Sequence, residues 1–170
     1  KALAGKEVRL SPFIDDDTEG IKRASTVKDM KTMFELAYLY FTSPRRDDES
    51  FKSTVNRTRS FLTNREANPQ VAYSDSVTAI LYGNNPRLAP IKKETLDKLN
   101  YNRILELYKE RFSDASGFSL ILVGNVNIDS LRPLLRNYMA VLPSLDRKET
   151  FRDNHISIRP VNETHYFVRS

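Results

Sequence analysis

The sequence predicts an α+β domain with two layers, in which helices cover one face of an antiparallel or mixed sheet. The first observation is a nearly unbroken apolar run at 118–123, bounded by Gly117 and Gly124. Its length, its flanking glycines and its β-branched residues favour a strand buried on both faces over a buried helix. The second is a pair of alternating segments at 7–13 and 19–24. The third is a series of amphipathic segments with helical spacing.

The two alternating segments predict an antiparallel hairpin that shares a sheet with residues 118–123. Val8 and Leu10 alternate with Arg9 and Ser11, and the first strand is expected to end near Pro12. The three aspartates at 15–17 are expected to form the turn. Carboxylates suit calcium, but the distal Glu of the known calcium loop is missing, so a solvated turn is the preferred interpretation.

Capping signals place the helices before the apolar run. The first helix is expected to begin at Thr26, with Asp29 three residues on as in a capping box, and to end at Pro44. Asp47 or Asp48 is expected to cap the second helix. The dipeptide at 68–69 supplies an N-cap asparagine and a first-turn proline for the third helix, which runs toward Tyr82 with Gly83 as its C-cap residue.

A short helical turn is expected at 95–99, and two further helices flank the apolar run. Asn100 can cap the helix before it, and Asn127 or Asp129 the helix after it, in which Pro133 lies near the first turn. In the first three helices the side chains expected to face inward are Met30, Met33, Phe34, Ala37, Tyr38 and Phe41, then Phe51, Val55, Phe61 and Leu62, then Val71, Val77, Ile80 and Leu81.

Composition narrows the class of protein. The 170 residues include 27 basic and 22 acidic side chains, and the net charge is +5. The basic residues are dispersed among acidic ones, so ordinary solvated helix faces are favoured over a nucleic-acid-binding surface. No apolar run approaches the roughly 20 residues that span a bilayer. The lack of cysteine excludes disulfides and thiolate ligands, and it fits a bacterial envelope protein and a bacterial cytoplasmic one equally well. The compartment stays open, with the bacterial periplasm or cell envelope weakly favoured.

Catalytic and metal-ligating patterns are missing from the sequence. The only histidines are His155 and His165, ten residues apart in a strand-like tail, and neither belongs to a zinc-peptidase motif. There is no Gly-x-Ser-x-Gly elbow, and the five glycines form no phosphate-binding loop. The prediction is therefore no catalytic residue, no metal ligand and no cofactor in this chain, with the substrate-binding residues unknown.

Three groups of short strings resemble the M16 (pitrilysin or insulinase-like) zinc metallopeptidases, specifically the non-catalytic C-terminal half of their bacterial long-chain members. They cover about the first 145 residues in one order. The strings are Leu3-Ala4-Gly5-Lys6 with Val8 to Pro12; Phe34 to Arg45 with Asp47 and Phe51; and Tyr108 to Phe112 with Asp114-Ala115, Phe118 to Val126 and Tyr138 to Ser144.

This resemblance implies a domain arrangement. Two similar halves of two domains each form a chamber, and zinc is expected in the N-terminal half, which carries an inverted His motif. Residues 1–145 would form most of the third domain, lacking its N-terminal part, and residues 146–170 a linker and the first strands of the fourth. The distal zinc Glu of the active half would correspond to the helix at 51–62, where Thr54, Val55, Thr58 and Phe61 offer no carboxylate.

The resemblance also implies partners and a role. The chain is expected to be a non-catalytic part that forms chamber wall, contacts the catalytic half of the same polypeptide and holds extended peptides. The alternative is a non-catalytic interaction subunit that pairs with an active peptidase. An unpaired sheet edge is also expected, beside the hairpin or beside the tail, where Ile156, Ile158, Tyr166 and Val168 alternate. Such an edge predicts self-association through strand pairing.

Overall fold

The computed structural model describes residues 3–15, 17–160 and 162–166. Their contacts divide the chain into two compact units. The first unit comprises Lys1–Arg46 and Asn102–Phe151, and the second comprises Asp47–Tyr101 and Arg152–Ser170. Each unit is described by itself.

The predicted hairpin is the sheet of the first unit. Strands β1 (Val8–Ile14) and β2 (Glu19–Ser25) pair antiparallel, with Val8 opposite Ser25 and Ile14 opposite Glu19. Strand β1 continues through Pro12, beyond the expected end. The turn is closed by Asp15, whose backbone N–H donates to the carbonyl of Thr18 at 2.8 Å. Asp16, the middle residue of the carboxylate turn, lies outside the described residues.

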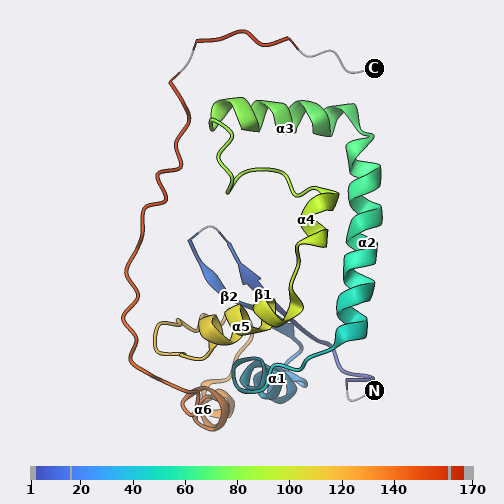
Figure 1. Cartoon of the computed structure of the whole chain (residues 1–170). Coiled ribbons are helices and arrows are strands. Elements are labelled where there is room, and N and C mark those ends of the chain that lie inside the picture. Colours follow the sequence, from blue (N-terminus) through green and yellow to red (C-terminus); the bar gives the residue numbers. More distant parts are fainter. Residues whose placement is uncertain (1–2, 16, 161, 167–170) are drawn as a thin grey trace. The chain divides into compact units, whose positions relative to one another are not determined.

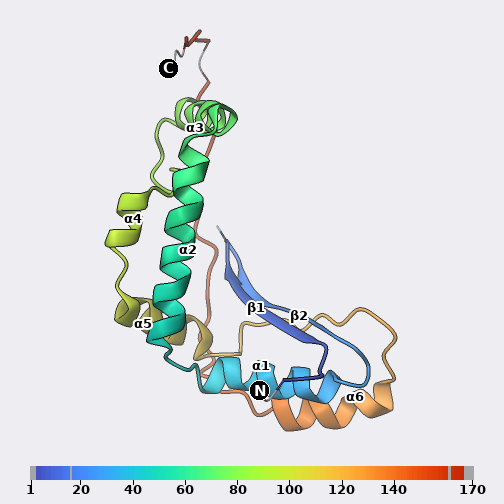
Figure 2. The same cartoon turned by 90° about the vertical axis from the view of Figure 1, so that its right-hand side faces the viewer.

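Helix α1 (Met30–Thr42) packs against the hairpin, as Figures 1 and 2 show. It begins at Met30, so the expected start at Thr26 is wrong. Thr26 and Asp29 do contact each other, but Asp29 also accepts a hydrogen bond from the backbone N–H of Glu7 at 3.0 Å. The pair therefore closes the turn before the helix and ties it to the start of β1. The buried side chains of α1 include Met33, Phe34 and Ala37.

An aromatic cluster forms the core of the first unit. Helix α5 (Tyr101–Phe112) ends with Phe112, whose side chain is 1% exposed. The Phe112 ring lies 5.6 Å from the ring of Phe41 and 5.7 Å from that of Phe118, measured between centroids. Tyr108 stacks on Phe112 and donates its hydroxyl to the carbonyl of Tyr40, and burial raises the pKa of Tyr108 to about 12. Helices α1 and α5 are thus joined through one apolar contact region.

Residues 118–123 do not form the predicted strand. They are extended without a ladder partner, and the only sheet among the described residues is the β1–β2 hairpin. The α+β class is confirmed, but the membership of this segment in the sheet of Val8 and Leu10 is wrong. The apolar run has the composition of a strand, yet strand formation also needs a neighbouring backbone, and no described segment pairs with this one.

Helix α6 (Ile128–Leu134) follows the extended segment and continues into a π-helical turn, Leu135–Met139. Asn127 is its N-cap, and its side-chain oxygen accepts from the N–H of Ser130 at 3.1 Å. Pro133 lies inside the helix rather than in its first turn, directly before the π-helical turn. Proline removes one backbone donor from α6, and the ladder widens further along the chain, as in the bond from the N–H of Ala140 to the carbonyl of Leu135.

The second unit consists of α2 (Asp48–Glu66), α3 (Pro69–Leu81) and the short α4 (Lys93–Asp97). The predicted caps are present: Asp47 accepts from Ser50, and Asn68 accepts from Gln70. Gly83 has a positive φ of 61° and ends α3 as expected. The two closing hydrogen bonds run from Gly83 to Ile80 and from Asn84 to Ala79, which is the Schellman pattern.

Helix α3 runs across the end of α2, and α4 lies beside α2 (Figures 1 and 2). Leu62 and Leu96 are buried at the contact between α2 and α4. Phe61 is 64% exposed, so its expected inward position is wrong. The expected inward residues of α3, namely Val71, Val77, Ile80 and Leu81, are only half-buried. The described residues therefore leave these faces of α2 and α3 only partly covered.

The C-terminal tail is extended, and its described residues, 152–160 and 162–166, contain no strand. The backbone N–H of Arg159 donates to the carbonyl of Leu81 at 2.8 Å, which holds the tail against the end of α3. Ile158 is 58% exposed and Tyr166 is 90% exposed. The expected strands at Ile156 and Ile158 are therefore not formed, and Val168 lies outside the described residues. None of the described helices combines the length and hydropathy that a membrane crossing requires.

Candidate functional site

The two histidines lie apart from any cluster of metal-ligating side chains. The Nδ1 atom of His155 is 3.4 Å from the carboxylate of Asp153, and the Nε2 atom of His165 is 3.0 Å from that of Glu163. Each pair is local to the tail. Across residues 3–15, 17–160 and 162–166, no group of three His, Cys, Asp or Glu side chains is placed to hold a metal ion. Each histidine thus has a carboxylate neighbour two residues away in the tail.

In the active half of M16 peptidases a distal Glu binds zinc, and the resemblance places the matching face of α2 at Thr54, Val55, Thr58 and Phe61. None of these four side chains is a carboxylate. Val55 and Thr58 are half-buried, and Thr54 and Phe61 are exposed. Hydroxyl and apolar side chains at these places can pack against other segments, but they lack the negative charge that stabilises a zinc ion.

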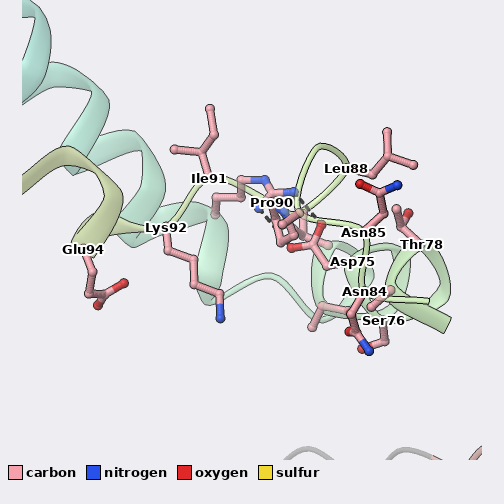
Figure 3. Close-up of a pocket in the computed structure, with 15 residues that line it drawn as sticks. Asp75, Ser76, Thr78, Asn84, Asn85, Leu88, Pro90, Ile91, Lys92 and Glu94 are labelled. Atoms are coloured by element: carbon pink, nitrogen blue, oxygen red, sulfur yellow. Dashed lines mark hydrogen bonds and ion pairs between the residues drawn. The ribbon is translucent and has the colours of Figure 1, made fainter. Parts of the chain in front are cut away.

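A pocket of about 680 Å³ lies in the second unit, between α3 and the irregular segment that leads to α4 (Figure 3). Asp75 lies near its centre, and Ile91 and Lys92 point in opposite directions from the same stretch of chain. The lining residues come from the end of α2, from α3 and from 84–94: they are Arg65, Val71, Ala72, Asp75, Ser76, Thr78, Ala79, Asn84, Asn85, Leu88, Ala89, Pro90, Ile91, Lys92 and Glu94. Apolar and polar groups are mixed in this lining.

The centre of the pocket is formed by an ion pair between two helices. The Nη1 and Nη2 atoms of Arg65 donate to the two carboxylate oxygens of Asp75 at 3.0 and 2.7 Å. Both side chains are 29% exposed, so the pair is only partly screened by solvent. A two-pronged Arg–carboxylate contact fixes orientation as well as distance, and it therefore holds α3 at a set angle to α2.

The hydroxyl groups of the pocket donate to backbone carbonyls of α3. The Ser76 hydroxyl donates to the carbonyl of Ala72 at 2.8 Å, and the Thr78 hydroxyl donates to that of Ser74 at 3.0 Å. Each hydroxyl is therefore engaged by a carbonyl of its own helix, and no imidazole lies among the lining residues. The geometry fits binding of a chain segment or side chain. The segment at 84–94 carries no motif of its own, so the sequence does not indicate this pocket.

The buried carboxylate of Asp114 serves as a structural anchor in the first unit. One of its oxygens accepts from the N–H groups of Ser116 and Leu145, at 2.9 and 3.0 Å, and the other accepts from that of Arg147 at 2.9 Å. The side chain is 4% exposed. The backbone N–H groups, with that of Leu145 contributing most, hold the pKa of Asp114 far below its usual range. A group already ionised and fully hydrogen-bonded is suited to clamping loops rather than to accepting protons.

The dispersed basic residues form ion pairs at several places. Lys31 lies 3.8 Å from Glu35, Arg59 lies 2.6 Å from Asp97, and Arg103 lies 3.2 Å from Glu106. Arg23, half-buried on β2, instead directs its Nη1 toward the sulfur of Met139 at 3.8 Å. Burial lowers the pKa of Arg23. These cations are distributed over different elements, and several of their charges are offset by a neighbouring carboxylate.

Comparison with known proteins finds zinc proteases. No family model matches the chain. It is 26% identical over 116 residues to a zinc protease PQQL-like protein of Arabidopsis thaliana, which covers 68% of this chain and 12% of that protein. It is 19% identical over 135 residues to the probable zinc protease PqqL of Haemophilus influenzae, which covers 79% of this chain and 14% of that protein. The chain therefore spans a small part of the curated relatives it matches.

A solved structure shares the fold. The chain matches the ferredoxin protease FusC, crystallised as a mutant in complex with Arabidopsis ferredoxin, with a TM-score of 0.68 and 15% identity. The match covers 92% of this chain and 17% of the FusC chain. The fold expected from the sequence strings is confirmed by this match.

Proposed function

Since this chain resembles the M16-type zinc metallopeptidases in both sequence and fold, we propose that it is a non-catalytic part of such an enzyme, forming chamber wall and binding extended peptide. The observation that carries the proposal is the fold match, which extends over 92% of this chain but only 17% of FusC. Peptide-bond hydrolysis would belong to the whole protein, with zinc held in its N-terminal half.

The described residues support a binding role more than a catalytic one. The resemblance to zinc proteases requires a cluster of zinc ligands somewhere in the enzyme, and no such cluster occurs among the described side chains. The pocket of the second unit offers a mixed apolar and polar lining in which hydroxyls, amides and the Arg65–Asp75 pair are already oriented. Pockets with an apolar lining and a few fixed polar groups are suited to holding ligands.

An extended peptide is the ligand class that fits the proposal. In the pocket, Val71, Ala72 and Ala79 present apolar surface, while Asn84 and Asn85 carry side-chain amides that can donate and accept hydrogen bonds. This combination can accept an apolar side chain and a peptide group of the same ligand. Because Asp75 is engaged by Arg65, the pocket does not require a cationic ligand.

A peptide-binding measurement tests the proposal. A fluorescently labelled, unstructured casein peptide is expected to bind the chain saturably without being cleaved. Ala79→Trp places an indole in the pocket and is expected to weaken binding by about tenfold or more, equivalent to about 1.4 kcal/mol. Ser74→Trp is the matched control, because Ser74 is exposed on the same helix and does not line the pocket.

The outcomes separate the possibilities clearly. If Ala79→Trp and Ser74→Trp bind the peptide with equal affinity, the peptide does not use the pocket. If the parent chain does not bind the peptide, the peptide-binding role is wrong. Cleavage of the peptide that a chelator abolishes would overturn the non-catalytic role. Circular dichroism of both variants checks that α3 is intact.

A further inference from the structure

Strand β2 directs two polar side chains at methionine sulfur atoms. The Nη1 atom of Arg23 lies 3.8 Å from the Sδ atom of Met139, and the hydroxyl of Ser25 lies 3.4 Å from the Sδ atom of Met33. Arg23 and Ser25 are two positions apart, so they fall on the same face of the strand. All four residues belong to the first unit, where α1 packs against both β2 and the π-helical turn that contains Met139. The two thioethers therefore face one side of β2.

The guanidinium of Arg23 has more hydrogen-bonding capacity than its contact with sulfur uses. A guanidinium carries five N–H donors, and a thioether sulfur is a weak acceptor. Arg23 is half-buried, and no carboxylate among the described residues forms an ion pair with it. Burial lowers the pKa of Arg23, and no neighbouring carboxylate offsets this effect. A partly desolvated cation of this kind is stabilised by a stronger acceptor placed beside it.

The methionines differ in their access to solvent. Met33 is 5% exposed, whereas Met139 is half-buried. Peroxides oxidise thioethers that they can reach, so Met139 is open to this reaction and Met33 is protected. Met30, the third methionine, is half-buried at the start of α1, and none of the described residues donates a hydrogen bond to its sulfur. Within the described chain, Met139 thus combines access to solvent with a cationic donor beside its sulfur.

We propose that Met139 is a site of oxidation by peroxides, at which Arg23 donates a hydrogen bond to the oxygen of the resulting sulfoxide. Hydrogen peroxide transfers one oxygen atom to the sulfur: the O–O bond breaks, an S–O bond forms, the sulfur loses two electrons and the peroxide leaves as water. The product is polar, and its oxygen is a better acceptor than the thioether. The distance of 3.8 Å between nitrogen and sulfur leaves room for this oxygen, because an N–H···O bond needs only about 2.9 Å between nitrogen and oxygen.

The position of Arg23 reverses the usual consequence of methionine oxidation. A sulfoxide normally disrupts the packing around it, because a polar group enters apolar surroundings. Beside Met139 the new oxygen meets a guanidinium that has no carboxylate partner among the described residues. The new hydrogen bond joins β2 to the π-helical turn more strongly than the thioether does. This inference does not depend on peptide binding by the pocket, which belongs to the second unit.

Peroxide treatment followed by peptide mass spectrometry tests the site. The chain carries Met30→Leu, a substitution of similar volume, so that Met139 is the half-buried methionine that remains. Met139 is expected to gain one oxygen atom about tenfold faster than Met33, or more, because of its greater access to solvent. Equal rates of oxidation at Met139 and Met33 would overturn the assignment of the site.

Thermal unfolding before and after oxidation tests the role of Arg23. The Met30→Leu chain is expected to keep or raise its melting temperature when Met139 is oxidised. With Arg23→Leu added, the sulfoxide loses its donor, and oxidation is expected to lower the melting temperature by about 4 °C or more. Lys22→Leu is the matched control, because it removes one positive charge from an exposed position of the same strand. It is expected to respond to oxidation as the Met30→Leu chain does.

Hydrogen exchange of the Arg23 guanidinium, followed by NMR in the Met30→Leu chain, gives a second measurement that needs no further variant. Exchange is expected to slow on oxidation, because the sulfoxide oxygen engages an N–H group that the sulfur holds only weakly. Unchanged exchange would overturn the role of Arg23. The same conclusion would follow if oxidation changed the melting temperature equally with and without Arg23, or if Lys22→Leu lost as much as Arg23→Leu.

Discussion

Replacing Phe112 by alanine is expected to lower the free energy of unfolding of the first unit by about 3–5 kcal/mol. The Phe112 side chain is 1% exposed and contacts the rings of Phe41, Tyr108 and Phe118. Its removal leaves a cavity where α1, α5 and the start of the extended segment meet. The free energy of unfolding of a whole domain is only about 5–15 kcal/mol, so this loss is a large fraction of it. Chemical denaturation followed by circular dichroism measures the loss.

The matched control is Phe151→Ala, since Phe151 belongs to the same unit and is 82% exposed. Its expected effect is within about 0.5 kcal/mol. Equal destabilisation by the two variants would show that the aromatic cluster is not the core of the first unit.

Acid is expected to destabilise the first unit through Asp114. The pKa of Asp114 is held below its unfolded value by the N–H groups of Leu145, Ser116 and Arg147. A carboxyl group with a depressed pKa stabilises the folded state above its unfolded pKa of about 3.9. That contribution is lost progressively as pH falls below the unfolded value toward the folded one. The melting temperature of the parent chain should therefore fall steeply with acid below about pH 4.

The variant Asp114→Asn removes this pH dependence by removing the titrating group. At neutral pH its melting temperature is expected to be lower than that of the parent by about 3–8 °C, since an amide cannot accept from all three donors as well as a carboxylate. The difference in melting temperature between the parent and Asp114→Asn should become smaller as pH falls below about 4. Asp17→Asn, an exposed residue in the hairpin turn, provides the control. A constant difference at all pH values would contradict this role for Asp114.

Local signals in the sequence predicted several of the helix ends. Asp47, Asn68 and Asn127 each cap the helix that follows, and Gly83 ends α3. These features depend on a few neighbouring residues, so the sequence alone specifies them. The hairpin was predicted for the same reason, because its two strands are adjacent in the chain and their side chains alternate.

Features that depend on distant partners were predicted less well. Residues 118–123 have the composition of a buried strand, but a strand forms only beside another backbone, and the described chain provides none there. Phe61 was expected to face inward because of its spacing on α2, yet the described residues leave 64% of its side chain exposed. Thr26 carries a capping signal, but the N–H of Glu7 competes for the Asp29 carboxylate and the helix begins later.

For the candidate site, too, features carried by short stretches of sequence were predicted, and features that need distant residues to meet were not. The sequence strings were sufficient to identify the resemblance to zinc metallopeptidases, and the fold match with FusC agrees with it. The pocket could not be predicted, because it arises where Arg65 and Asp75 join two helices and a loop without regular structure closes over them.

The proposed non-catalytic role is tested most directly by the zinc content of the purified chain. The chain would be incubated with excess zinc, desalted and analysed for metal, and assayed in parallel for hydrolysis of an unstructured peptide with and without a chelator. The proposal predicts far less than about one zinc per chain and no chelator-sensitive hydrolysis. Retention of about one zinc per chain, together with hydrolysis that the chelator abolishes, would contradict it.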